Sequence, residues 1–250
     1  MTGEAAPDRR VFEIAGRDAK PFLQGLVTND LGRLSEGLVY AALLSPQGKY
    51  LADFFLVPDG DRILLDAHAT QAEALGRRLA MYRLRAEVTI TLTDLKVTRG
   101  LGDAPEGAFA DPRHPALGWR RYGTEAGGAP QIDWDAIRVA QCIPETGIEL
   151  IPEESYILEA GFERLNGVDF RKGCYVGQEV TARMKHKTEL RKGLTRVTVD
   201  GEAPAETEIT AEGKPVGRLF TRSGDHAIAY LRLDRAGGEM RAGAARIALA

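Results

Sequence analysis

The final part of the chain, from residue 194 onward, limits the possible folds most strongly because its apolar segments are all short. Each has the length of a β-strand, and glycines that favour turns lie between them. Several short strands in close succession are typical of a small barrel or sandwich. We therefore predict a C-terminal β domain with strands at residues 194–199, 208–210, 216–221, 227–233 and 245–249.

The region before this domain alternates between strand patterns and helix patterns. Two expected strands, at residues 38–44 and 50–57, flank a Pro-X-Gly turn and predict a hairpin. A helical stripe at 71–84 is followed by a strand at 87–93 in which apolar and polar residues alternate. A short helix is also expected at 153–162. This order of elements predicts α+β layers built on an antiparallel sheet.

The composition excludes several classes of protein. Hydrophobic residues make up 44% and charged residues 28% of the chain, which is typical of a globular protein. The longest apolar stretches are strand-sized, so we expect no membrane association. Cys142 and Cys174 do not have the spacing of a zinc site, and the first ten residues resemble neither a signal peptide nor a transit peptide. We therefore expect reduced thiols in the cytosol, and we expect the localisation to be the bacterial cytoplasm.

Charge is distributed unevenly along the sequence. The whole chain has a net charge of −3, whereas residues 164–196 hold nine basic and three acidic residues. A basic segment on an acidic body indicates an anionic ligand, although a solvated charged face explains the same count.

Within this basic segment, residues 172–179 have the sequence Lys-Gly-Cys-Tyr-Val-Gly-Gln-Glu. A cysteine reacts as its thiolate, which nearby positive charge and helix N-termini favour. The two glycines permit a sharp turn, which would expose the thiol of Cys174 beside the basic residues. The alternative is a small buried thiol packed in a tight turn. Cys142 has no comparable surroundings and is interpreted as structural.

This eight-residue segment resembles the signature of the YgfZ family, folate-binding proteins that maintain iron–sulfur clusters. The segments at 21–30, 45–54 and 181–192 are also similar to that family. The resemblance implies the cloverleaf fold of the glycine cleavage T protein, with two ferredoxin-like α+β subdomains and a small C-terminal β-barrel. The expected division is 1–48 with 130–190, then 49–129, then 191–250.

The resemblance also implies a function and a set of site residues. It implies a tetrahydrofolate-binding protein that assists assembly or repair of iron–sulfur clusters in client enzymes, including radical-SAM enzymes that modify tRNA. Cys174 would be its functional residue, either as a transient cluster ligand or as a redox partner, because one thiolate cannot hold a cluster alone. No resident metal is expected. The turn around Cys174 would be shaped by Lys172, Gly173, Tyr175, Gly177, Gln178 and Glu179. Folate contacts are expected from Asp53, Arg138, Glu145, Arg183 and Lys185.

Two other functions remain open at this point. The T protein is an aminomethyltransferase, but it usually has two adjacent acids where this chain has Ala52 and Asp53, which puts that activity in doubt. The basic run at 183–196 suggests an RNA-binding module. That run lacks the interleaved aromatic residues of a stacking platform, so we do not expect direct binding of nucleic acid.

Overall fold

The computed structural model describes residues 3–186 and 190–250 and divides into two compact units. The first consists of Met1–Ile132 and Glu163–Val180, and the second of Asp133–Phe162 and Thr181–Ala250. Two of the charges counted in the basic segment, Lys187 and Glu189, lie outside the described residues.

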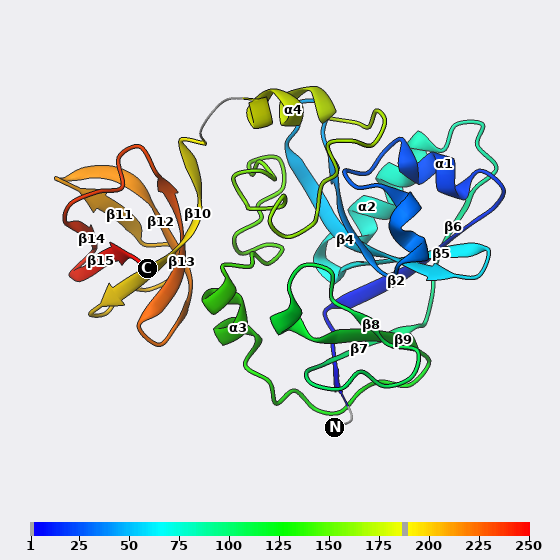
Figure 1. Ribbon diagram of the computed structural model, residues 1–250, viewed down its shortest axis with the longest axis horizontal. Helices are drawn as coiled ribbons and strands as arrows, with labels where there is room; N and C mark the ends of the chain where they lie inside the picture. The colour runs from blue at the N-terminus through cyan, green and yellow to red at the C-terminus, as the bar shows by residue number, and fades with distance from the viewer. Residues whose placement is uncertain (1–2, 187–189) are drawn as a thin grey trace. The chain divides into compact units, whose positions relative to one another are not determined.

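The first unit is built on a five-stranded antiparallel sheet with the order β3-β4-β5-β2-β6 (Figure 1). Four of these strands, in the order β6-β2-β5-β4, have the ferredoxin-like arrangement, and β3 extends it at one edge. The strands are β2 (Arg9–Ala15), β3 (Val39–Leu44), β4 (Tyr50–Asp59), β5 (Arg62–His68) and β6 (Thr89–Leu92).

Two helices, α1 (Ala19–Gln24) and α2 (Ala69–Tyr82), supply apolar side chains to the core on one face of this sheet. Leu23 and Leu79 from the helices share this core with Phe54 and Leu65 from the strands. Burial of these side chains is the main force that holds the layers together.

The expected hairpin is confirmed, because β3 pairs with β4 and Gly48 N donates to Ser45 O at its turn. The pairing joins residues on both sides of the expected boundary after residue 48 in one sheet; the expected division into subdomains stays a prediction. The expected helix at 71–84 is present as α2. The strand expected at 87–93 is shorter, and Leu92 is 57% exposed because β6 is the edge strand.

A second, four-stranded sheet also belongs to the first unit and has the order β1-β7-β9-β8. Two short 3₁₀ helices, η1 and η2, complete the unit. The strands and 3₁₀ helices are β1 (Glu4–Ala5), β7 (Lys96–Gly100), β8 (Phe109–Ala110), β9 (Trp119–Gly123), η1 (Leu31–Ser35) and η2 (Pro115–Leu117).

The Trp119 ring packs directly on glycine backbone in this sheet. A Cβ atom added to Gly3 would lie 2.3 Å from the Trp119 ring, and one added to Gly100 would lie 2.5 Å from it. Glycine is required at both positions, because the buried Trp119 ring occupies the space that a Cβ atom would need.

The second unit contains a closed six-stranded barrel with the order β10-β13-β12-β11-β14-β15 (Figure 1). The barrel has its own apolar core, which includes Val197, Leu219 and Leu231. All five expected strands are present, and the barrel form is confirmed. The strands are β10 (Lys192–Asp200), β11 (Glu208–Ala211), β12 (Lys214–Ser223), β13 (His226–Arg232), β14 (Met240–Ala242) and β15 (Ala245–Leu249). The sequence pattern missed β14 because it has three residues and an exposed Arg241 at its centre.

Helix α3 (Trp134–Gln141) belongs to the second unit, and helix α4 (Gln178–His186) continues the chain from the first unit into the second. The short helix expected at 153–162 is wrong, because this segment consists of turns. Its backbone is left-handed at Glu153 and Gly161, with φ values of 65° and 78°, which interrupts a right-handed helix. Among the described residues, no helix is both long enough and apolar enough to cross a membrane.

We predict that Gly100→Ala destabilises the protein by about 1–3 kcal/mol, because its new methyl group would collide with the buried Trp119 ring. Gly123→Ala is the matched control, since no atom lies within 4 Å of its added Cβ. Urea unfolding followed by Trp fluorescence measures both. Equal stability of the two variants would contradict the packing argument.

Candidate functional site around an exposed cysteine

Cys174 lies in an irregular loop of the first unit, immediately before helix α4. Its side chain is exposed, whereas that of Cys142 is half-buried. The exposure excludes the alternative of a small buried thiol in a tight turn. A thiol in this position is open to a metal centre or to a second protein.

Lys172 anchors the loop on one side of Cys174. Its side chain is only 8% exposed, and its Nζ atom donates to the backbone carbonyl oxygens of Gln24 at 2.7 Å, Val27 at 2.5 Å and Asn29 at 3.0 Å. The same Nζ atom lies 5.1 Å from the centroid of the Tyr175 ring, within cation–π distance. A single ammonium group therefore ties the loop to the segment that follows α1.

The environment of Lys172 also changes its protonation. Burial penalises the charged form, while Asp30 and Asp169 favour it, and the net effect lowers the pKa of Lys172 to about 8. The group is mostly charged at neutral pH and becomes neutral in mildly alkaline solution.

A buried pair of polar residues reinforces this anchor. Thr28 Oγ1 donates to Gly167 O at 2.6 Å, and Asp169 N donates to Thr28 O at 3.0 Å. Asn29 Nδ2 donates to Asn166 O at 2.7 Å and to Tyr40 O at 2.8 Å. From the sequence alone, Asn29 is explained as a helix-end cap. The signal that was missed is a Thr-Asn pair a few residues after α1.

Gly177 fixes the loop on the other side of Cys174. Its φ is +83°, and an added Cβ would lie 2.6 Å from Ser45 O, in the turn of the β3–β4 hairpin. Gly48 in that turn is equally restricted, since its Cβ would lie 2.8 Å from Val180 Cβ. The loop and the hairpin therefore pack backbone against backbone, which brings together two of the segments that carried the family resemblance.

The remaining signature residues have distinct surroundings. Tyr175 is buried, whereas Gly173 is exposed and no atom lies within 4 Å of a Cβ added there. Gln178 begins α4, and Glu179 lies in its first turn, where a negative charge suits the helix dipole. Cys174 is thus an exposed residue between two buried ones, Lys172 and Tyr175.

Asp53 lies on β4, also in the first unit, and is buried. Its carboxylate accepts hydrogen bonds from the hydroxyl groups of Tyr50 at 2.6 Å and Tyr40 at 3.0 Å. Burial, and then the charge of Asp53, raise the pKa of Tyr40 well above its usual value, so this phenol stays protonated and donates. The neighbouring Ala52 belongs to the apolar core instead, because successive residues of a strand face opposite sides.

A buried amide lies next to this carboxylate. The Tyr50 hydroxyl is 3.1 Å from Gln71 Oε1, and Gln71 Nε2 has no hydrogen-bond partner within residues 3–186 and 190–250. An unsatisfied buried donor is costly, which indicates that a ligand or solvent group completes it.

Five charged residues form a second buried network in the first unit. Asp66 accepts from Arg9 at 2.7 Å and from Arg120 at 2.8 Å, and Arg113 pairs with Asp111 at 2.8 Å. Burial raises the pKa of Asp66, but the charges of Arg9 and Arg120 outweigh it, so the net pKa is lowered and the carboxylate is ionised. Sequence patterns did not reveal this network, because Arg9, Asp66 and the segment 111–120 lie far apart along the chain.

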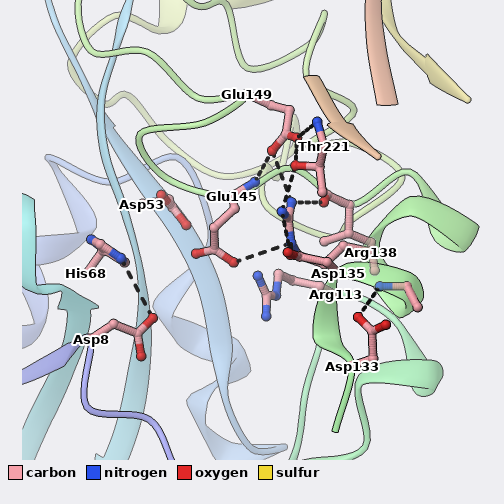
Figure 2. A network of polar contacts seen from close by, with 12 residues as sticks. Asp8, Asp53, His68, Arg113, Asp133, Asp135, Arg138, Glu145, Glu149 and Thr221 are labelled. Atoms are coloured by element: carbon pink, nitrogen blue, oxygen red, sulfur yellow. Dashed lines mark hydrogen bonds and ion pairs between the residues drawn. The ribbon is translucent and has the colours of Figure 1, made fainter. Parts of the chain in front are cut away.

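Arg138 belongs to the second unit, where its guanidinium group is fully engaged (Figure 2). Nη1 donates to Ile143 O and Glu149 Oε2, each at 3.0 Å, and Nη2 donates to Thr221 Oγ1 at 2.9 Å. Nη2 and Nε both donate to Asp135 Oδ1, at 3.0 and 3.3 Å. All five N–H bonds are used within the protein, and the expected role of Arg138 in folate binding stays a prediction. Arg138 links α3 to the barrel strand β12.

The other expected folate contacts lie in two different units. Glu145 is half-buried in the second unit, 3.9 Å from Arg138 Nε. Arg183 and Lys185 are exposed on the part of α4 that belongs to the second unit, whereas Asp53 and Cys174 belong to the first. At Cys142 the backbone is left-handed with φ 51°, a conformation that glycine usually adopts, so the cysteine side chain is accommodated there.

Comparison with solved structures defines the class of fold. The glycine cleavage system aminomethyltransferase T from Bartonella henselae matches with a TM-score of 0.77, covering 96% of this chain and 82% of that chain at 13% sequence identity. The chain therefore has the glycine cleavage T-protein fold, as expected from the sequence. Residues 191–250 also match the family model described as the CAF17 C-terminal beta-barrel domain.

Sequence relatives define the family. Iron-sulfur cluster assembly factor IBA57, mitochondrial, from Homo sapiens is 32% identical, covering 97% of this chain and 81% of the relative. The IBA57 homolog from Pyricularia oryzae is 31% identical, covering 92% and 71%. This chain belongs to the IBA57 family of iron–sulfur cluster assembly factors.

These relatives refine one expectation and overturn another. The resemblance to iron–sulfur proteins with a T-protein fold is confirmed, but the relatives are named IBA57, not YgfZ. The expectation of a bacterial cytoplasmic protein is contradicted, because these relatives are eukaryotic and each is named as mitochondrial.

The lowered pKa of Lys172 predicts a pH dependence of stability. The unfolded lysine holds its proton up to pH about 10.4, whereas the folded one releases it near pH 8. The unfolded state therefore binds more protons between these values, and stability rises with pH across this window. We expect the difference in unfolding free energy between wild type and Lys172→Met to grow from pH 8 to pH 10.4, with exposed Lys214→Met as control. A difference in unfolding free energy that does not change with pH would contradict the lowered pKa of Lys172.

Proposed function

We propose that this chain assists the assembly or repair of iron–sulfur clusters and that Cys174 is its functional thiol. The observation that carries the proposal is an exposed cysteine on a loop that Lys172 and Gly177 fix on both sides. A fixed thiol has little conformational entropy to lose when it binds a partner. Membership of the IBA57 family supplies the chemical context.

The cluster would be cargo in this proposal, not a resident cofactor. Within the described residues there is no group of three or more histidine, cysteine or acidic side chains that could hold a metal ion. A single thiolate cannot retain a cluster, whose usual protein ligands are four cysteines. Cys174 would lose its proton on binding iron and would then be displaced by a cysteine thiolate of the client protein.

We further propose that a tetrahydrofolate binds beside Asp53. The residues there fit a pterin ring, because a buried carboxylate can accept from its N–H groups and Gln71 Nε2, which has no partner among the described residues, can donate to a ring acceptor. When bound, tetrahydrofolate supplies a carrier for one-carbon groups.

An aminomethyltransferase remains the second candidate, favoured by the fold and by Asp53. The position of Ala52 supports this candidate despite the missing acid. A carboxylate at Ala52 would face the apolar core and would not reach the face on which Asp53 lies.

The role of Cys174 is tested by expressing variants in cells that lack the endogenous protein. We expect Cys174→Ser to lose most of the activity of a cluster-dependent client, such as a radical-SAM methylthiotransferase that modifies tRNA. Cys142→Ser, which changes the half-buried thiol, should retain that activity. Both variants should unfold at the wild-type temperature. Full rescue by Cys174→Ser would rule out the proposed role.

Folate binding is tested by calorimetry and thermal shift with tetrahydrofolate. At a ligand concentration of 100 Kd, binding should stabilise the native state by about 2.7 kcal/mol. Asp53→Asn should weaken binding about tenfold or more, because it removes a charged acceptor. Asp61→Asn, in an exposed turn, should bind like wild type.

Two results would redirect the proposal. Absence of binding to the wild-type protein rules out folate as the ligand. Formation of methylenetetrahydrofolate in a reconstituted glycine cleavage reaction, with this chain replacing the T component, identifies the aminomethyltransferase instead.

A further inference from the structure

A cavity of about 340 Å³ lies within the second unit, between the turn segment 149–160 and strands β10, β12 and β13. Leu194, Phe220 and Tyr230 of the strands line it. They alternate with Leu219 and Leu231, which fill the barrel core. Because successive residues of a strand face opposite sides, the cavity lies on the outer face of the barrel wall. It involves neither Cys174 nor Asp53.

Hydrogen bonds at both ends of this cavity join the segment 149–160 to the barrel strands. At one end Leu194 N donates to Glu159 O at 2.8 Å. At the other end Thr221 Oγ1 donates to Glu149 Oε1 at 2.5 Å, and Arg138 holds the second oxygen of the same carboxylate. The segment 149–160 is therefore fixed to the barrel across the space it encloses. A ligand would find the cavity already formed.

The lining combines aromatic rings with carboxylates. The rings are those of Tyr156, Phe220 and Tyr230, and the acids include Glu154 and Glu159 beside the engaged Glu149. Arg218 is the basic residue in this lining, and it is 3.3 Å from Glu206 in an ion pair with more than half of its side chain exposed. The charge of the lining is therefore negative.

Glu159 and Tyr230 form the polar centre of the cavity. The Tyr230 hydroxyl donates to Glu159 Oε2 at 2.6 Å. Burial, and then this hydrogen bond, raise the pKa of Tyr230, so the phenol remains a donor and Glu159 remains the acceptor. A carboxylate accepts in about four directions, so Glu159 can take further donors from a ligand.

We propose that this cavity binds an organic cation with the size of an arginine or lysine head group. The aromatic rings would contact the cation through their faces, and Glu159 would accept its N–H groups. The volume lies within the range of small-ligand pockets, about 300–1,000 Å³. The same chemistry is presented by a free small molecule and by a basic side chain of a partner protein.

The full chain is titrated with methylguanidinium and with methylurea, its neutral counterpart of the same shape, while the tyrosine ring signals are followed by NMR. We expect methylguanidinium to shift the signals of Tyr156 and Tyr230 and methylurea to bind at least about tenfold more weakly. Failure of methylguanidinium to bind, or equal binding of methylurea, overturns the proposal.

Variants assign the contacts. Glu159→Gln keeps the acceptor for Tyr230 but removes the charge, and should weaken methylguanidinium binding about tenfold. Tyr156→Leu keeps apolar volume but removes the ring face, and should weaken it about threefold. Exposed Glu208→Gln on β11 is the control and should bind like wild type. Unchanged binding by both lining variants, with wild-type unfolding temperatures, overturns the assignment of the cation to this cavity.

Two further probes identify the source of the cation. Free arginine carries its own charged backbone groups, whereas a Gly-Arg-Gly peptide with blocked ends presents only the side chain. Tighter binding of free arginine supports a small-molecule ligand, and tighter binding of the peptide supports a basic side chain of a partner protein.

Discussion

The candidate site depends on the hydrogen bonds that the ammonium group of Lys172 donates. One nitrogen atom donates to three backbone carbonyls, one in the last residue of α1 and two in the segment after it, and so attaches a loop that has no regular secondary structure. Charged hydrogen bonds of this kind contribute more than neutral ones. Without them, three buried carbonyls would lose their donor and the loop would lose its attachment next to Cys174. The position of the thiol is therefore set by the residue two places before it.

The sheet of the first unit separates two environments by the alternation of its strands. On β4 the even-numbered Ala52 and Phe54 enter the apolar core, while Asp53 between them meets the hydroxyl groups of two tyrosines. A chain that buries both faces of a sheet has to satisfy every polar group it places there. Here tyrosine donors satisfy Asp53 and arginines satisfy Asp66, while Gln71 Nε2 has no partner among the described residues.

Secondary-structure elements could be predicted from the sequence, whereas contacts between residues far apart along the chain could not. The hairpin turn, the amphipathic helix α2 and the barrel strands follow from local signals that turn residues and periodicity provide. The sequence indicated that the signature glycines allow a sharp turn, but it did not indicate what Gly177 packs against. Ser45 and Gly48 approach Gly177 only in the folded chain. The internal hydrogen bonds of Arg138 were not predicted from the sequence for the same reason. Its five donors are used by residues up to 83 positions away, and a local pattern contains no information about them.

The two glycines of the signature differ in a way that defines the approach to the thiol. Gly177 is pressed against the hairpin, so that position tolerates no side chain, whereas Gly173 borders open space and no crowding atom explains it. On the Gly173 side, a bulky inorganic group can therefore reach sulfur over bare backbone. Because Gly173 has no side chain, a partner can approach the Cys174 sulfur from more directions. The packing of Gly177 against the hairpin keeps the backbone of the loop in one position.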